Sequence, residues 1–198
     1  SSEIRAQCSL GKDEPVIVFV GTLYDFSGLD AFIRHFPEIL KAVPETRLLI
    51  VGDGPQRPKL QRIIDELRLQ KRVTITGFQP NKTIPAYINV ATLCINPFLI
   101  NDTTRDIFPT KILQYLACGK TTVATPLPGM TAAVGKEHGI VYADTPDDIA
   151  SAVVALLKSP DQRQRLEQAA LDYVKQAHSY DKIAQQLIEI LNEVVDRG

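Results

Sequence analysis

Several features that would assign a protein to a class at once are missing from this sequence. It has no apolar run approaching the roughly 18 residues that a membrane-spanning helix needs, and no N-terminal signal peptide is visible. Its 22 Lys and Arg residues are balanced by 23 Asp and Glu residues and are dispersed along the chain. Because nucleic-acid binding needs a clustered basic surface, the sequence predicts a cytoplasmic protein that binds no nucleic acid.

Cysteine and histidine are too few and too scattered to predict a metal site. The three cysteines have no pair at the spacing of metal ligands, which is typical of buried, reduced thiols. His35, His138 and His178 lie far apart in the sequence. Asp147 and Asp148 follow Pro146 before an apolar helix, where helix-start electrostatics explains them better than metal binding. We therefore expect no metal ion and no cofactor.

The glycine pattern of dinucleotide-binding proteins, Gly-x-Gly-x-x-Gly, is also absent. After the first apolar run the sequence instead reads Gly21-Thr22-Leu23-Tyr24. Asp53 follows the second apolar run, where NAD-binding folds place a ribose-binding acid. It lies further from the glycine loop at Gly21 than the roughly 20 residues that such folds have. A nicotinamide-dependent oxidoreductase domain therefore stays open as an alternative.

Short apolar runs alternate with segments of helical spacing through most of the chain. The expected strands are Val16–Val20, Leu48–Val51, Val73–Thr76, Thr92–Ile95, Thr121–Ala124 and Gly139–Tyr142. Apolar strands separated by helices predict a parallel sheet covered on both faces, and right-handed crossovers favour a doubly wound, Rossmann-like α/β fold. A short helix capped by Thr83 is expected before the fourth strand. The remaining sequence predicts extra C-terminal helices.

The loop after the fourth strand is the best candidate for a ligand site. If the strand order is 3-2-1-4-5-6, this loop meets the loop after the first strand at the topological switch point. It leads into a predicted helix with Pro109 as its first residue, since a missing N–H costs nothing there. Thr110 and Lys111 would present unpaired N–H groups and a positive charge, which suit a diphosphate. From the residues alone, a plain helix start with Gln114 as a solvated side chain explains the segment equally well.

The order and spacing of short motifs over most of the chain resembles the C-terminal half of a family-4 GT-B glycosyltransferase. Single motifs are weak, but together they are specific. The matching pieces are Gly21-Thr22-Leu23, Gly28-Leu29 at the head of a helix, Pro44, Leu49-Ile50-Val51-Gly52-Asp53-Gly54-Pro55, Ile75-Thr76-Gly77-Phe78, Asn96-Pro97-Phe98, the run from Phe108 to Lys120, and Tyr180-Asp181-Lys182-Ile183-Ala184.

This resemblance implies a role for each matching position. The family's C-terminal domain binds the nucleotide-sugar donor, and its Glu-x7-Glu element falls on Asp106 and Gln114. Asp106 is thereby implied to act as the catalytic residue at the donor sugar, and Gln114 to hold the ribose. The other implied substrate-binding residues are Thr22, Phe108, Thr110 and Lys111 around the diphosphate, and Gly77, Phe78 and Gln79 around the base.

The sequence departs from the family's pattern at the charged positions. Gln114 stands where a glutamate is usual, and a neutral amide lacks the strength of a charge-assisted hydrogen bond. The family's phosphate-binding Arg and Lys fall on Thr22 and Ser27, which carry no charge. Our hypothesis is that Lys111 or Arg105 supplies the missing positive charge. The same departures favour, as an alternative, a non-catalytic nucleotide-sugar-binding or scaffolding module.

The sequence thus predicts that residues 1–198 form a single nucleotide-sugar-binding domain, a fragment of a two-domain enzyme. The whole enzyme would move a sugar from a nucleoside-diphosphate sugar to a hydroxyl acceptor, and the resemblance implies retention of anomeric configuration. The missing N-terminal, acceptor-binding domain would belong to the same gene or to a separate chain, and would mediate any peripheral membrane association. Alone, this chain is expected to bind nucleotide weakly and to transfer nothing.

Overall fold

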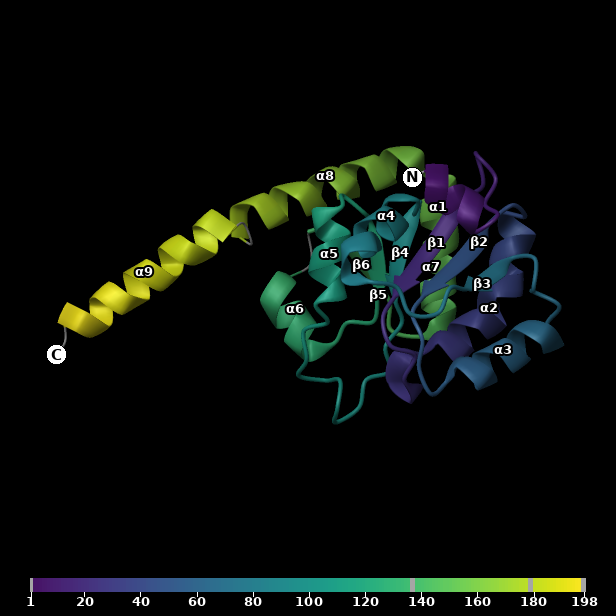
Figure 1. Cartoon of the computed structure of the whole chain (residues 1–198), viewed down its shortest axis with the longest axis horizontal. Coiled ribbons are helices and arrows are strands. Elements are labelled where there is room, and N and C mark those ends of the chain that lie inside the picture. Colours follow the sequence, from purple (N-terminus) through teal and green to yellow (C-terminus); the bar gives the residue numbers. More distant parts are fainter. Residues whose placement is uncertain (1, 136–137, 178–179, 197–198) are drawn as a thin grey trace.

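The computed structural model describes residues 2–135, 138–177 and 180–196, and its centre is a six-stranded sheet (Figure 1). Neighbouring strands all run parallel in the order β3-β2-β1-β4-β5-β6. The strands are β1 (Val16–Val20), β2 (Arg47–Val51), β3 (Val73–Ile75), β4 (Leu93–Asn96), β5 (Thr122–Ala124) and β6 (Ile140–Tyr142). The predicted doubly wound sheet is confirmed, and each strand end lies within one residue of its expected position.

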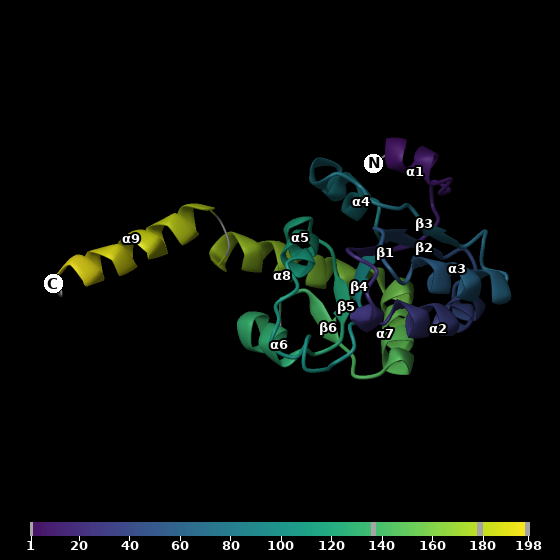
Figure 2. The same cartoon turned by 60° about the horizontal axis from the view of Figure 1, so that its bottom comes forward.

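Helices cover both faces of this sheet. α2, α3 and α7 lie on one face, and α4 and α5 lie on the other (Figure 2). Right-handed crossovers produce this arrangement, because the direction of winding reverses between β1 and β4. The helices are α1 (Ser2–Gln7), α2 (Leu29–Ala42), α3 (Arg57–Glu66), α4 (Ile84–Asn89), α5 (Lys111–Ala117), α6 (Pro128–Val134), α7 (Pro146–Lys158), α8 (Pro160–Ala177) and α9 (Tyr180–Asp196), with 3₁₀ turns η1 (Asp25–Ser27) and η2 (Asn81–Thr83).

The core is built around β1, and every side chain of this strand is buried. A strand covered on both faces by helices has no solvent side, which is why its sequence is apolar throughout. At its carboxyl end the backbone N–H of Val20 donates a hydrogen bond of 2.7 Å to the hydroxyl of Tyr115 on α5. Both Tyr115 and Val20 are buried, so this bond holds α5 beside the end of β1.

The helix after the fourth strand begins later than the sequence predicted. Pro109 is not its first residue, because α5 begins at Lys111 and Thr110 occupies the N-cap position. The Ile112 N–H donates to the Pro109 carbonyl at 2.9 Å, three residues back. A hydrogen bond between residues three apart is that of a 3₁₀ turn, and such turns are frequent at the ends of α-helices.

The predicted capping role of Thr83 is also wrong. Thr83 does precede α4, but its side chain makes no capping bond, and its Oγ1 donates to the Pro80 carbonyl at 2.8 Å instead. The η2 turn runs directly into α4, so Thr83 has helical backbone angles rather than the extended angles of a capping residue.

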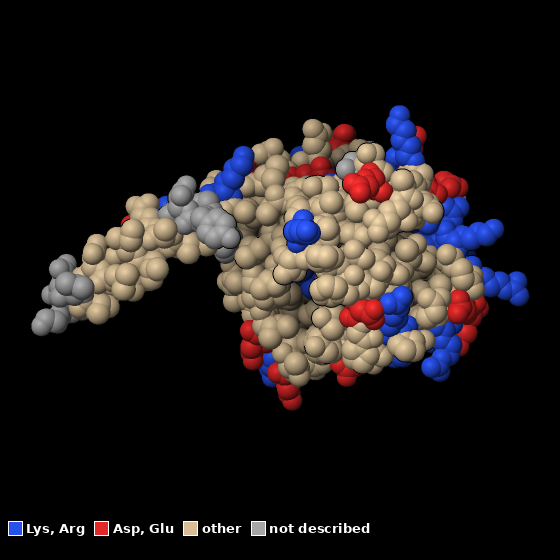
Figure 3. All heavy atoms as spheres, in the orientation of Figure 1, with Lys and Arg blue, Asp and Glu red and all other residues tan. Residues whose placement is uncertain are grey.

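The last helix extends away from the sheet along the line of α8 (Figure 1). Its apolar side chains have the predicted helical spacing, but they are exposed: Ile183, Leu187, Ile188, Ile190, Leu191 and Val194. The face of α9 that is visible in Figure 3 shows mostly uncharged side chains among the described residues. Among the described residues, none of the helices combines the length and the apolar character that crossing a bilayer requires.

Candidate functional site

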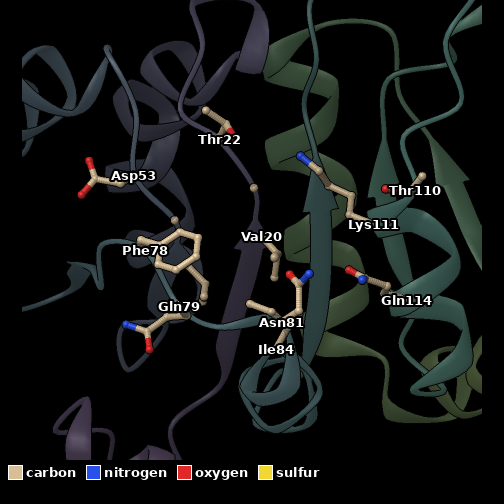
Figure 4. A pocket seen from close by; sticks show the side chains of 13 residues that line it. Val20, Thr22, Asp53, Phe78, Gln79, Asn81, Ile84, Thr110, Lys111 and Gln114 are labelled. Atoms are coloured by element: carbon tan, nitrogen blue, oxygen red, sulfur yellow. The ribbon is translucent and has the colours of Figure 1, made fainter.

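A pocket opens at the carboxyl ends of β1 and β2, next to the start of α5 (Figure 4). Its cavity volume is about 290 Å³. This is the crevice where an open α/β sheet binds ligands, beside the point at which the strand order reverses. The pocket is lined by Val20, Gly21, Thr22, Val51, Gly52, Asp53, Phe78, Gln79, Asn81, Ile84, Thr110, Lys111 and Gln114.

The ammonium group of Lys111 is the main charge in this pocket. Its Nζ lies 4.1 Å from the ring centroid of Phe19 and 4.3 Å from that of Phe98, so two aromatic faces hold the cation. Burial lowers the pKa of Lys111 from its usual 10.5 to about 7. Lys111 makes no ion pair with any carboxylate that the structure describes. Near neutral pH the pocket therefore contains a partly protonated amino group that no carboxylate pairs with among the described residues.

Gly21 makes room for this lysine. A Cβ atom at Gly21 would lie 2.7 Å from Lys111 Nζ, and its φ of +140° is one that other residues rarely adopt. The Gly21 loop itself is held against the next strand, since the Gly21 N–H donates to the Val51 carbonyl at 3.0 Å. The amino group of Lys111 and the backbone of the Gly21 loop thus meet on one wall of the pocket, as the hypothesis of a compensating lysine requires.

The start of α5 adds polar groups beside the ammonium. Thr110 and Gln114 are both exposed and line the pocket about one turn apart (Figure 4). Within the described ranges, no intramolecular acceptor is found for the backbone N–H groups of Thr110 and Lys111. N–H groups at the start of a helix are oriented toward an anion, and the cation of Lys111 reinforces them.

The opposite wall is formed by the segment that follows β3. Phe78 is 78% exposed at the mouth of the pocket, which is unusual for a large apolar side chain that has no packing role. Gln79 follows it, and its Nε2 donates to the Thr76 carbonyl at 3.4 Å. An exposed aromatic ring at the edge of a polar pocket can stack on a flat, conjugated ligand.

Two lining residues were missed by the sequence reasoning. Asn81 and Ile84 belong to η2 and α4, and the side chain of Asn81 faces that of Gln114 across the pocket (Figure 4). Neither belongs to a motif. The only signal in the sequence is that both closely follow Gly77 and Phe78, so the turn after β3 brings them to the same edge of the sheet.

Similarity to known protein families identifies the family of this chain. A model of the family described as glycosyl transferases group 1 matches residues 14–159. The chain belongs to the group 1 glycosyltransferases. This membership decides against the oxidoreductase alternative, and it confirms the resemblance that the motifs suggested.

Individual relatives agree with this assignment. The GDP-mannose-dependent alpha-(1-6)-phosphatidylinositol monomannoside mannosyltransferase of Mycolicibacterium smegmatis is 33% identical over 80% of this chain and 42% of its own length. The alpha-D-kanosaminyltransferase of Streptomyces kanamyceticus is 27% identical over 98% of this chain and 49% of its own length. The chain thus spans about half the length of the curated relatives it matches.

A solved structure shows the same fold. Anabaena Alr3699/HepE, in complex with UDP-glucose, superposes with a TM-score of 0.79 at 22% identity. The match covers 97% of this chain and 52% of that protein.

Some of the site residues that the sequence predicted lie outside the pocket. Arg105 and Asp106 are exposed on the loop before α5, and the Arg105 guanidinium lies 4.0 Å from Asp102 rather than near Lys111. The backbone here is fixed against the start of α6, because the Gly129 N–H donates to the Arg105 carbonyl at 2.8 Å. Of the two basic residues proposed to replace the family's pair, only Lys111 lines the pocket.

Of the other predicted site residues, some line the pocket and some do not. Thr22, Phe78, Gln79, Thr110 and Gln114 line the pocket together with Lys111. Phe108 is half-buried against the core, and Gly77 lies just behind the pocket wall, bridged to Gly52. Ser27 is buried.

Asp53 is engaged by its own neighbours. Its carboxylate accepts a 2.8 Å bond from the Gly54 N–H and a 2.5 Å bond from Arg57, and these two contacts lower the pKa of Asp53 below its ordinary value. Its side chain points away from the centre of the pocket (Figure 4).

Proposed function

We propose that this chain is the donor-binding half of a glycosyltransferase that moves a sugar from a nucleoside-diphosphate sugar to a hydroxyl acceptor, with retention of anomeric configuration. One observation carries the proposal: the unpaired ammonium of Lys111 lies between Phe19 and Phe98, beside the Gly21 loop, at the crevice where such folds bind ligands. A shielded cation without a carboxylate partner is stabilised by an anionic ligand.

The diphosphate is proposed to bind between Lys111 and the start of α5. When the bond between the anomeric carbon and the diphosphate oxygen breaks, negative charge develops on the departing nucleoside diphosphate. Lys111 and the N–H groups of Thr110 and Lys111 would stabilise that charge, since they are already oriented before the reaction. We further propose that the donor pocket needs no metal ion. Its lining carboxylate, Asp53, is turned outward and bonded to Arg57.

The nucleoside is proposed to occupy the rest of the pocket. The base would stack on the exposed ring of Phe78 and contact the backbone at Gln79, while the amides of Asn81 and Gln114 would bond the ribose from opposite sides. Neutral amides make weaker hydrogen bonds to hydroxyl groups than a carboxylate does, so the ribose contact is expected to add modestly to the affinity.

Asp106 is retained as the proposed acid at the donor sugar. It precedes α5 on the same segment as Thr110 and Lys111, and its side chain is exposed. Asp106→Asn in the full-length enzyme should lower turnover while leaving the affinity for the nucleoside diphosphate unchanged.

A second domain is proposed to complete the enzyme and to bind the acceptor. The chain matches about half of each relative, and the apolar side chains of α9 are exposed. Exposed apolar surface of this kind marks a contact with another domain or protein. We propose that this domain belongs to the same gene or to a separate chain, that it mediates any peripheral membrane contact, and that the enzyme acts in the cytoplasm.

Isothermal titration calorimetry with UDP, GDP, their sugars and NAD tests the proposal. We expect weak one-to-one binding of at least one nucleoside diphosphate, no binding of NAD, and no sugar transfer by the chain alone. Lys111→Ala should weaken the binding, whereas Lys82→Ala, an exposed lysine on the turn beside the pocket, should not. Absence of binding by any nucleotide would favour the scaffolding module instead.

A further inference from the structure

Three side chains outside the donor pocket meet where α2 and α7 pack together. His35 and Glu38 lie one turn apart on α2, and Asp147 lies in the first turn of α7. One nitrogen or oxygen atom from each of the three lies within 4.8 Å of the other two. Asp147 is far from the other two in sequence, so the cluster exists only in the folded chain.

The spacing of this cluster is too wide for hydrogen bonds and suits a bound ion. His35 Nδ1 lies 3.6 Å from Glu38 Oε2 and 3.9 Å from Asp147 Oδ1. Neither distance makes a hydrogen bond. Ligands about 2.1 Å from a tetrahedral zinc ion lie about 3.4 Å from each other, so a small inward movement of the carboxylates would complete such a site.

The nitrogen of His35 is itself unsatisfied. Nδ1 is buried and has no hydrogen-bond partner. A buried polar atom without a partner is costly, and in a native protein it calls for an explanation such as an ion. Since Nδ1 faces both carboxylates, a cation between the three groups would satisfy it.

No lysine or arginine compensates the charge of the two carboxylates in the part of the chain that the structure describes. Among the described residues, neither Glu38 nor Asp147 forms an ion pair with any lysine or arginine. With a neutral imidazole the cluster carries a charge of about −2, which a divalent cation balances. The side chains of Glu38 and Asp147 are 57% and 72% exposed, so an ion can enter from solvent.

Helix capping does not account for Asp147. The capping box of α7 is made by Thr145 and Asp148, with the Asp148 N–H donating to Thr145 Oγ1 at 3.1 Å and the Asp148 carboxylate accepting from the Thr145 N–H at 3.2 Å. Asp147 takes no part in these bonds, and its carboxylate is directed to His35 instead. The sequence interpretation of helix-start electrostatics therefore fits Asp148 better than Asp147.

We propose that His35, Glu38 and Asp147 form a divalent-cation site that joins α2 to α7, with zinc as the best-fitting ion. One imidazole nitrogen and two carboxylate oxygens are established zinc ligands, and water would take the fourth position. The site lies outside the donor pocket, so its role is to fix α7 against α2. Because α2 follows the η1 turn and the Gly21 loop, the ion would also stiffen the support behind that loop.

Calorimetric titration of the chelator-treated chain with zinc chloride tests the proposal. We expect one zinc ion per chain. His35→Ala and Asp147→Asn should each weaken the binding by at least about tenfold, since each removes one of three protein ligands. Zinc should also raise the unfolding temperature of the unmodified chain, because it binds only the folded state, and this rise should be lost in both variants.

Two matched variants separate this site from other zinc-seeking groups. Asp161→Asn removes another first-turn helix aspartate, and His138→Ala removes a histidine that stacks on Tyr173. Both should bind zinc as the unmodified chain does. His35→Ala and Asp147→Asn retain all three cysteines, so a thiol site would survive in them. Binding that is absent from the unmodified chain, or that is unchanged in His35→Ala and Asp147→Asn, would overturn the proposal.

Discussion

The two walls of the donor pocket are built in opposite ways. The α5 wall carries a shielded cation that two aromatic rings hold in place, next to a helix start anchored through Tyr115. The β3 wall carries an exposed ring, Phe78, and amide side chains at the surface. Under the proposed function, the diphosphate would meet groups that the core already holds in place, whereas the nucleoside would meet side chains at the surface.

The largest effect is expected on the α5 wall. Lys111→Ala should weaken UDP binding by about 2 kcal/mol, or about 30-fold, because it removes a charge-assisted contact to the diphosphate. Pyrophosphate, which has no nucleoside, should lose a similar factor. Calorimetry on both ligands measures this. If Lys111→Ala binds UDP as tightly as the Lys82→Ala control does, the α5 wall does not bind the diphosphate through Lys111.

A smaller and more selective effect is expected on the β3 wall. Phe78→Ala should weaken UDP binding by about 1 kcal/mol, or about fivefold, because base stacking on an aromatic ring is lost. Binding of pyrophosphate should not change, since it offers nothing to stack. An equal loss for both ligands would show that Phe78 supports the pocket rather than the base.

Burial of Lys111 should also appear in the stability of the ligand-free chain. Its pKa is lowered from 10.5 to about 7, so between these values the unfolded chain binds more protons than the folded chain. The free energy of unfolding should therefore rise with pH from about 7 to about 10.5 and be lowest, for this group, below about 7. Lys111→Met should raise the unfolding temperature at pH 6 by about 3 °C and lose this advantage near pH 10. Thermal melts across this range measure the difference, and Lys82→Met should show no such trend.

The smallest effect is expected at the ribose. Gln114→Ala should weaken UDP binding by about threefold, because an exposed neutral amide makes a hydrogen bond worth less than about 1 kcal/mol net. Pyrophosphate should be unaffected. A loss as large as that of Lys111→Ala would mean that Gln114 reaches the diphosphate as well.

The fold could be predicted from the sequence because its strands are apolar and most of them are followed within two residues by a glycine or a proline. The sequence placed the start of this helix at Pro109, two residues before the observed start at Lys111, because the tight turn from Pro109 to Ile112 has no signature in the residue types. The rings around Lys111 could not be foreseen. Phe19 belongs to β1 and Phe98 follows the end of β4 by two residues, and only the pairing of these strands brings the two rings together.

The positions of Asp106 and Asn81 could not be predicted from the motifs. The resemblance implies that Asp106 acts at the donor sugar, and this stays a prediction; in the structure its loop is held against Gly129 at the start of α6, outside the pocket lining. Asn81 shows the converse, because it lines the pocket without belonging to any motif. Spacing along the chain identified the helix that carries the charge, but it could not give the distance of each side chain from the ligand.

Proton uptake on nucleotide binding tests the central claim most directly. If Lys111 is the cation that receives the diphosphate, UDP should raise its pKa from about 7, and at pH 8 binding should take up close to one proton per chain. Calorimetric titrations in buffers of different ionisation enthalpy measure this number, and Lys111→Ala should reduce it to near zero. UDP binding at pH 8 without proton uptake, or with an uptake that Lys111→Ala retains, would contradict the account.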